Sequence, residues 1–172
     1  MTTANQITIG RILAVPLFLI LAYLGFTWPA LVVYILACLS DMLDGYIARH
    51  YHQVTNFGKF MDPLADKMLV LAAMCYFVEL GTMPGWALAV VLLREFAVSG
   101  LRMVAVEQGR VIAAAWSGKI KTTVTMIGLG VMLVFGHIPA ISWTVTGLIV
   151  LTTVWSGIEY FVKNRDVFKD VR

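Results

Sequence analysis

Charged residues are scarce in this sequence. They make up 13% of its 172 residues, whereas hydrophobic residues make up 60%. A soluble domain usually carries about twice this share of charge. The composition therefore argues against a soluble enzyme and predicts an integral membrane protein. No shift in composition divides the chain, so we expect one domain over residues 1–172.

Cysteine and like-charge blocks are also rare. Cys38 and Cys75 lie within apolar stretches and have neither the number nor the spacing of a disulfide framework or a zinc site.

The net charge of +3 fits contact with anionic lipid headgroups. We therefore expect membrane lipids as partners and no nucleic acid.

Long apolar stretches are what the sequence does contain. A helix that crosses a bilayer needs about 20 mostly apolar residues. Six stretches qualify and predict an all-α, polytopic membrane protein with six transmembrane helices; they cover about residues 9–26, 29–49, 57–80, 84–106, 119–135 and 141–162.

The connections between these stretches alternate in charge. Residues 25–29, 81–85 and 136–139 carry Gly and Pro but no Lys or Arg, whereas the other connections and the C-terminal tail are basic. Basic connections remain on the cytoplasmic side of a membrane. The pattern predicts that both termini and the polar turn at residues 50–56 are cytoplasmic.

Four aspartates stand out in these apolar surroundings. Asp41 and Asp44 are three residues apart, and Asp62 and Asp66 are four apart, so each pair shares one face of a helix. Both pairs lie about 13 Å from the polar turn, given a rise of about 1.5 Å per residue. Two helices joined by that turn would bring four carboxylates into one layer.

Four close carboxylates cannot all stay ionised without compensating positive charge. Divalent cations such as Mg²⁺ bind oxygen ligands and leave positions for substrate phosphate. Structural ion pairs or exposure to solvent are the alternative. We favour a metal site because ionisable residues inside membrane helices are usually functional.

A second polar group combines basic residues from the fourth and fifth stretches. Arg94 and Arg102 are eight residues apart on one helix face, and Lys119 and Lys121 begin the next helix. A charged side chain in hydrocarbon costs at least about 2.5 kcal/mol, so we expect the arginines to face the bundle interior or a water-filled cavity. The four residues would suit a phosphate group, although Arg94 could instead pair structurally with Glu95 or Asp66.

Near the N-terminus, Asn5, Thr8 and Arg11 follow one another at intervals of three and share a helix face. They fit either a site or an interfacial anchor in which Arg11 extends to the membrane surface.

The central stretch resembles the CDP-alcohol phosphotransferase family. The family pattern D-x2-D-G-x2-A-R-x8-G-x3-D-x3-D is matched without a gap by Asp41, Asp44, Gly45, Ala48, Arg49, Gly58, Asp62 and Asp66. Further motifs at residues 5–11, 63–69, 94–102, 118–123, 156–161 and 165–168 are similar to bacterial members that make phosphatidylglycerol phosphate. Ala4, where many relatives have Pro, is a departure.

This resemblance implies a homodimer of six-helix protomers in a bacterial plasma membrane, with the active site facing the cytoplasm. It implies transfer from CDP-diacylglycerol to sn-glycerol 3-phosphate, giving phosphatidylglycerol phosphate and CMP. It also implies two Mg²⁺ or Mn²⁺ ions, with Asp66 as the catalytic base.

The implied ligand sets fall into three groups of residues. The metal ligands are Asp41, Asp44, Asp62 and Asp66. The CDP site comprises Asn5, Thr8, Gly45, Ala48, Arg49 and Gly58, where small residues let a nucleotide approach the backbone. The phosphate of glycerol 3-phosphate would bind Arg94, Arg102, Lys119 and Lys121.

Other functions remain open at this stage. A cardiolipin synthase or a phosphatidylinositol-phosphate synthase would keep the same aspartates and use another acceptor. An intramembrane prenyltransferase also uses Asp-rich helices with Mg²⁺ but usually has more spans. A divalent-cation transporter is the alternative from another class, and it would show cation flux without CMP release.

Overall fold

The chain is all-helical in a computed structural model that describes residues 3–50, 56–110, 112–113 and 115–168. Side chains at 3–6, 41–50, 56–63 and 66 are outside this description. The described residues form α1 (Thr3–Tyr23), α2 (Thr27–His50), α3 (Asn56–Glu79), α4 (Gly85–Glu107), α5 (Trp116–Phe135) and α6 (Pro139–Lys163), followed by a short 3₁₀ helix, η1 (Arg165–Phe168). All six predicted helices are confirmed, although the first begins earlier than expected, at Thr3.

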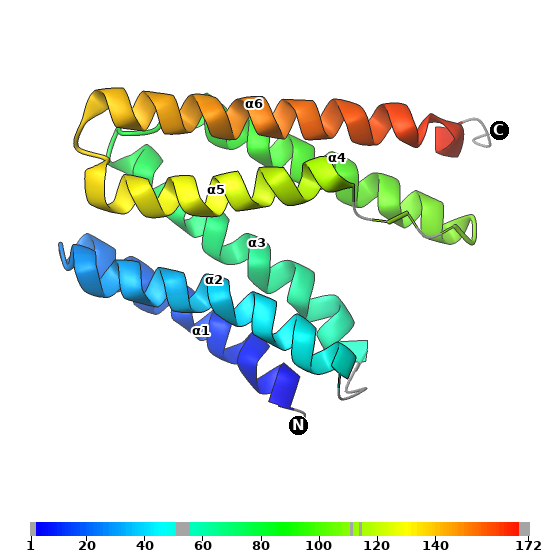
Figure 1. The fold of residues 1–172 in the computed structure, drawn as a ribbon, viewed down its shortest axis with the longest axis horizontal. Coiled ribbons are helices and arrows are strands. Elements are labelled where there is room, and N and C mark those ends of the chain that lie inside the picture. Colours follow the sequence, from blue (N-terminus) through cyan, green and yellow to red (C-terminus); the bar gives the residue numbers. More distant parts are fainter. Residues whose placement is uncertain (1–2, 51–55, 111, 114, 169–172) are drawn as a thin grey trace.

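The helices run alternately up and down the bundle. The α1–α2, α3–α4 and α5–α6 connections all lie at one end, at the left in Figure 1. Gly25 and Gly81 end α1 and α3 with positive φ angles of 78° and 71°, a conformation that glycine adopts without steric penalty. The turn residues read from the sequence therefore set the helix boundaries.

The main core lies where α1, α2, α3 and α5 meet. Phe18, Tyr34, Met74 and Leu129 are among its buried side chains, and the Phe18 and Tyr34 rings are 5.7 Å apart. A smaller cluster joins α4, α6 and η1 around Leu101. In Figure 1, α3 crosses behind α5 and runs between the α1–α2 pair and the α5–α6 pair.

Large apolar side chains also cover much of the outer surface. Leu13, Leu93 and Leu151 are 65%, 71% and 66% exposed, which is typical of a surface that faces lipid rather than water. Among the residues that the structure describes, α5 and α6 are long and apolar enough to cross a membrane, and α1 and α2 contribute shorter apolar stretches. The prediction of six spans with cytoplasmic termini stays a prediction.

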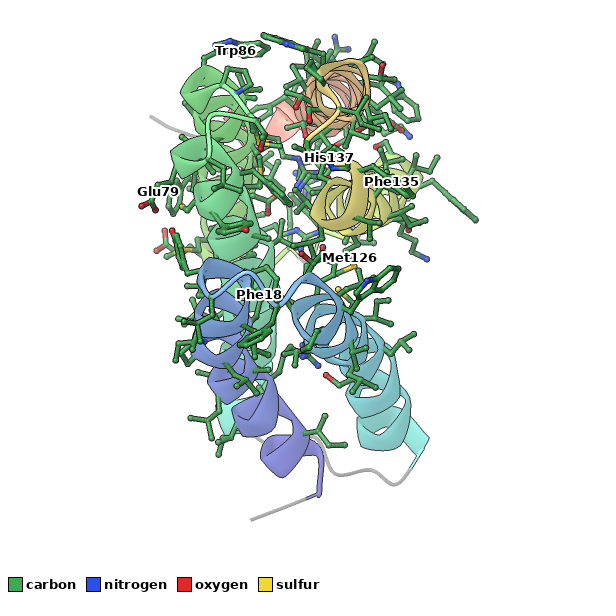
Figure 2. All side chains as sticks on the ribbon, turned by 90° about the vertical axis from the view of Figure 1, so that its left-hand side faces the viewer. Phe18, Glu79, Trp86, Met126, Phe135 and His137 are labelled. Atoms are coloured by element: carbon green, nitrogen blue, oxygen red, sulfur yellow. The ribbon has the colours of Figure 1, made fainter. Side chains whose placement is uncertain are left out.

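The end with the uncharged connections carries aromatic and polar side chains. Figure 2 looks onto this end, where Glu79, Trp86 and His137 lie. Glu79 accepts a hydrogen bond from the Tyr23 hydroxyl, which ties α3 to α1. Trp28, Trp86 and Trp143 begin α2, α4 and α6 and are all more than half exposed, a position that suits a membrane–water interface.

Candidate active site

The aspartate pairs lie on two neighbouring helices. Asp41 and Asp44 belong to the second half of α2, and Asp62 and Asp66 belong to the first half of α3. These two helices contact each other, and the last residues of α2 and the first residues of α3 lie at the end opposite the uncharged connections (Figure 1). The helical spacing and the shared end of the bundle are as the sequence predicts.

The four aspartates predicted to bind metal lie outside the described side chains. The same is true of five predicted CDP-site residues, Asn5, Gly45, Ala48, Arg49 and Gly58. Elsewhere, in the side chains that are described, no three His, Cys, Asp or Glu residues gather into a group that could hold a metal. Carboxylates at i, i+3 and i, i+4 on adjacent helices, the pattern of the four aspartates, fit hard divalent ions.

The helix position before the first aspartate is held by a buried basic residue. Arg11 of α1 is 2% exposed and donates from Nε to the Ser40 hydroxyl of α2 over 3.2 Å. Ser40 directly precedes Asp41. Thr8, one turn before Arg11, is completely buried. Arg11 therefore does not extend to the membrane surface, and this face of α1 packs toward the first aspartate pair.

A cluster of charged side chains lies beside the second aspartate pair. Glu95 of α4 accepts from Lys121 of α5 over 2.7 Å and from Arg94 over 3.0 Å, both at Oε1. Its Oε2 lies 3.4 Å from the Lys67 ammonium of α3, and Lys67 directly follows Asp66. Lys67 also donates to the Ser99 hydroxyl over 2.8 Å. We call these residues, Lys67, Arg94, Glu95 and Lys121, the Glu95 cluster.

Burial makes this cluster energetically costly unless its charges are paired. The side chains of Lys121, Arg94 and Glu95 are only 7%, 13% and 14% exposed. An unpaired charge in such surroundings is strongly unfavourable, so each basic group needs an acceptor. One described carboxylate serves three basic groups, which leaves an excess of positive charge among the described side chains and suits a bound anion.

Arg94 is fixed in position by α6. Its Nε and Nη2 donate to the Ser156 hydroxyl over 3.1 and 2.8 Å. A Cβ atom at Gly157 would lie 3.3 Å from the Arg94 Cγ, and one at Gly118 would lie 3.6 Å from Nη2. The small residues on both neighbouring helices thus make room for the guanidinium.

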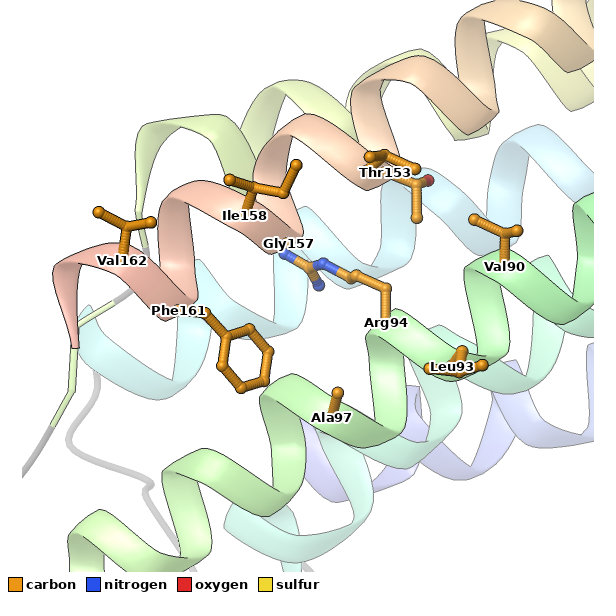
Figure 3. A pocket seen from close by; sticks show the side chains of 10 residues that line it. Val90, Leu93, Arg94, Ala97, Thr153, Gly157, Ile158, Phe161 and Val162 are labelled. Atoms are coloured by element: carbon orange, nitrogen blue, oxygen red, sulfur yellow. The ribbon is translucent and has the colours of Figure 1, made fainter. Parts of the chain in front are cut away.

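An apolar groove of about 480 Å³ runs between α4 and α6 beside Arg94. Figure 3 shows its lining, with the Arg94 side chain reaching from α4 toward α6 at Gly157, and Phe161 farther along the groove. Thr153, completely buried, also lines it. Arg94 therefore belongs to the Glu95 cluster and also lines an apolar groove.

The other two predicted phosphate ligands lie apart from this cluster. Arg102, two turns beyond Arg94, is exposed, donates to the Tyr160 hydroxyl over 2.7 Å and stacks on that ring at 5.4 Å. Lys119 is exposed, and its ammonium lies 5.4 Å from the Trp116 ring centre. The structure thus brings Arg94 and Lys121 together, but not all four residues.

Two members of the cluster were not among the predicted site residues. The sequence indicates Glu95 only as a structural partner of Arg94 and gives Lys67 no role in the predicted site. The available signal was that each is an ionisable residue within a long apolar stretch. Sequence spacing alone could not show that Lys67 and Lys121 converge on Glu95, since the three residues come from different helices.

Comparison with known proteins shows the family to which the chain belongs. The chain matches the family described as CDP-alcohol phosphatidyltransferase over residues 1–155, and it belongs to that family. The match includes both aspartate helices and the whole Glu95 cluster.

The names of individual relatives specify one reaction within the family. The chain is 40% identical to the CDP-diacylglycerol–glycerol-3-phosphate 3-phosphatidyltransferase of Bacillus subtilis, with 96% of each chain covered. It is 36% identical to a probable phosphatidylglycerophosphate synthase of Mycobacterium tuberculosis, covering 93% of this chain and 80% of the relative. A Salmonella typhimurium protein that has the same name as the Bacillus subtilis relative is 34% identical to this chain, with 90% of each chain covered.

Proposed function

We propose that this chain transfers a phosphatidyl group from CDP-diacylglycerol to sn-glycerol 3-phosphate, forming phosphatidylglycerol phosphate and CMP. The observation that carries the proposal is the 40% identity to a relative named for this reaction, extending over 96% of both chains. The donor and the acceptor both carry phosphate, in keeping with an aspartate site next to a basic cluster.

The reaction requires a hydroxyl oxygen of glycerol 3-phosphate to attack the phosphorus that bears diacylglycerol. A new P–O bond forms, the bond from that phosphorus to the CMP oxygen breaks, and CMP leaves. Asp66 is the proposed base that accepts the hydroxyl proton. A carboxylate is a weak base, so alignment of the two substrates must supply much of the rate enhancement.

The donor set proposed for two divalent ions is Asp41, Asp44, Asp62 and Asp66. When bound, Mg²⁺ or Mn²⁺ would offset the negative charge of the diphosphate and of the attacked phosphorus. Asn5, Thr8, Gly45, Ala48, Arg49 and Gly58 are the proposed contacts of the CDP moiety.

The proposed phosphate site for the acceptor is centred on Arg94 and Lys121. Arg94 uses three of its five N–H groups on Ser156 and Glu95, so two remain for other acceptors among the described groups. Arg102 and Lys119 would assist from the rim of the site. A guanidinium beside an ammonium suits a phosphate monoester.

We further propose a bacterial plasma membrane location with six spans, a cytoplasmic active site and a homodimeric state. The exposed apolar side chains on all six helices support burial in lipid. The basic residues at the end that carries the aspartates support its cytoplasmic orientation.

The test is CMP release by the purified protein in detergent with CDP-diacylglycerol and Mg²⁺. Four reactions are compared, containing glycerol 3-phosphate, inositol phosphate, phosphatidylglycerol or no acceptor. We expect release only with glycerol 3-phosphate, loss of release after chelation, and recovery when Mg²⁺ or Mn²⁺ is restored.

Each alternative function has its own outcome in this assay. CMP release that depends on phosphatidylglycerol or inositol phosphate would show that the acceptor is not glycerol 3-phosphate. The proposed aspartate site would be unaffected by that result. No release with any acceptor from folded protein, together with cation flux in proteoliposomes, would favour a transporter.

A further inference from the structure

The geometry points to Glu95 as a positioning residue for the acceptor phosphate: its carboxylate holds Lys121 and Arg94 where the phosphate binds. This inference rests on the proposed function and adds a residue and a role to it. Glu95 does not itself contact substrate in this account, because a carboxylate would repel the phosphate; it acts through the two basic groups.

The first support is the number of contacts that Glu95 makes. Its two carboxylate oxygens lie 2.7, 3.0 and 3.4 Å from basic groups of Lys121, Arg94 and Lys67. These groups come from α3, α4 and α5. A single carboxylate thus fixes the relative positions of three helices beside Asp66.

The second support is the burial of Lys121. Its side chain is 7% exposed, so its ammonium has little water to solvate it. Without Glu95, the Lys121 ammonium and the Arg94 guanidinium would repel each other with no described carboxylate between them. Lys121 would then turn toward water, and the phosphate would lose one of its two central ligands.

The third support is that Arg94 has other hydrogen-bond partners, whereas the Lys121 ammonium has one among the described residues. Ser156 holds two nitrogens of Arg94 from α6, and Lys67 has Ser99 as a second acceptor. Among the described contacts, the Lys121 ammonium is held only by Glu95. The loss of Glu95 should therefore act mainly through Lys121.

The first experiment measures steady-state kinetics of full-length Glu95→Gln in detergent, varying each substrate in turn. We expect the KM for glycerol 3-phosphate to rise about tenfold or more, which is the scale of one lost charged hydrogen bond. The KM for CDP-diacylglycerol should change less than twofold. Glu79→Gln, which alters a carboxylate at the opposite end of the bundle, is the matched control and should leave both values unchanged.

Glu95→Asp is the conservative variant. It keeps the negative charge but retracts it by one methylene, so we expect an intermediate KM for glycerol 3-phosphate. This variant also keeps the experiment informative if Glu95→Gln does not fold, because an unchanged KM in a folded Glu95→Asp protein would overturn the inference.

A double-mutant cycle tests whether Glu95 acts through Lys121. Once Lys121→Met has removed the ammonium, adding Glu95→Gln should raise the KM for glycerol 3-phosphate by less than twofold. Independent, multiplicative effects would overturn the positioning role, as would parallel changes in the KM of both substrates. Wild-type protein that shows no release dependent on glycerol 3-phosphate would instead overturn the proposed function itself.

Discussion

At the scale of single residues, the polar groups of this protein divide into two sets with different surroundings. The aspartates follow the family pattern on α2 and α3, beside Ser40 and Lys67. The basic residues differ in burial, since Lys121 is buried and paired whereas Lys119 is exposed on Trp116. Two lysines that are two positions apart in sequence are thus expected to differ in their contribution to substrate binding.

The role of Asp66 gives the first prediction at this scale. Asp66→Asn keeps the size of the side chain but removes its charge and its ability to accept a proton. We expect CMP release to fall by at least about a thousandfold, because the change removes both the proposed general base and a proposed metal ligand. CMP release is measured with saturating substrates and excess Mg²⁺.

The matched control for this change is Asp166→Asn in η1, about 100 residues along the chain from the family pattern. It should retain near-wild-type turnover. Circular dichroism should show the same helix content for both variants. If the Asp66→Asn variant turned over at nearly the wild-type rate, Asp66 would not be the catalytic base.

At the scale of helices, small residues decide how closely neighbours pack. A Cβ atom at Gly128 of α5 would lie 2.8 Å from the Val145 Cγ1 of α6, which is closer than side-chain carbons pack. Membrane helices commonly use glycine at such contacts, because close approach of the helices increases van der Waals contact. Gly128 therefore belongs to the packing of α5 on α6.

We predict that Gly128→Ala lowers the thermal unfolding midpoint in detergent by several degrees, because overpacking costs about 1–3 kcal/mol. The control is Gly147→Ala on α6, where an added Cβ meets no atom within 4 Å. This control should be neutral or slightly stabilising, since alanine favours the helix. Adding Val145→Ala should restore the midpoint of Gly128→Ala; failure to do so would place the strain elsewhere.

At the scale of the whole molecule, the alternating connections define two ends of the bundle. The end with residues 24–26, 80–84 and 136–138 carries no Lys or Arg in those connections, whereas the opposite end carries the aspartate helices, Arg110 and the basic tail. A membrane protein keeps its basic end in the cytoplasm.

The predicted orientation can be measured with a membrane-impermeant maleimide on intact cells. Cys38 and Cys75 are first replaced by Ala, and single cysteines are introduced as His137→Cys and Arg110→Cys, both at exposed positions. We expect labelling of His137→Cys from outside and labelling of Arg110→Cys only after permeabilisation. The reverse pattern would invert the topology and move the proposed active site outside the cell.

The helices and the aspartate pattern could be predicted from the sequence alone. Helix length follows from apolar stretches, and the helix ends follow from local turn residues such as Gly25 and Gly81. The spacing within each aspartate pair is also local, because a helix brings residues three and four apart onto one face. These features need no knowledge of how the helices pack.

Only the tertiary structure decided which basic residues meet. Lys67, Glu95 and Lys121 lie on three helices and converge within 3.4 Å, whereas Arg102 turns to Tyr160 and Lys119 to Trp116. A helix surrounded by lipid is apolar on its outer face as well as on its inner face, so its hydrophobic pattern does not reveal which side faces its neighbours. The partners of a charged side chain in such a helix are therefore set by packing between helices.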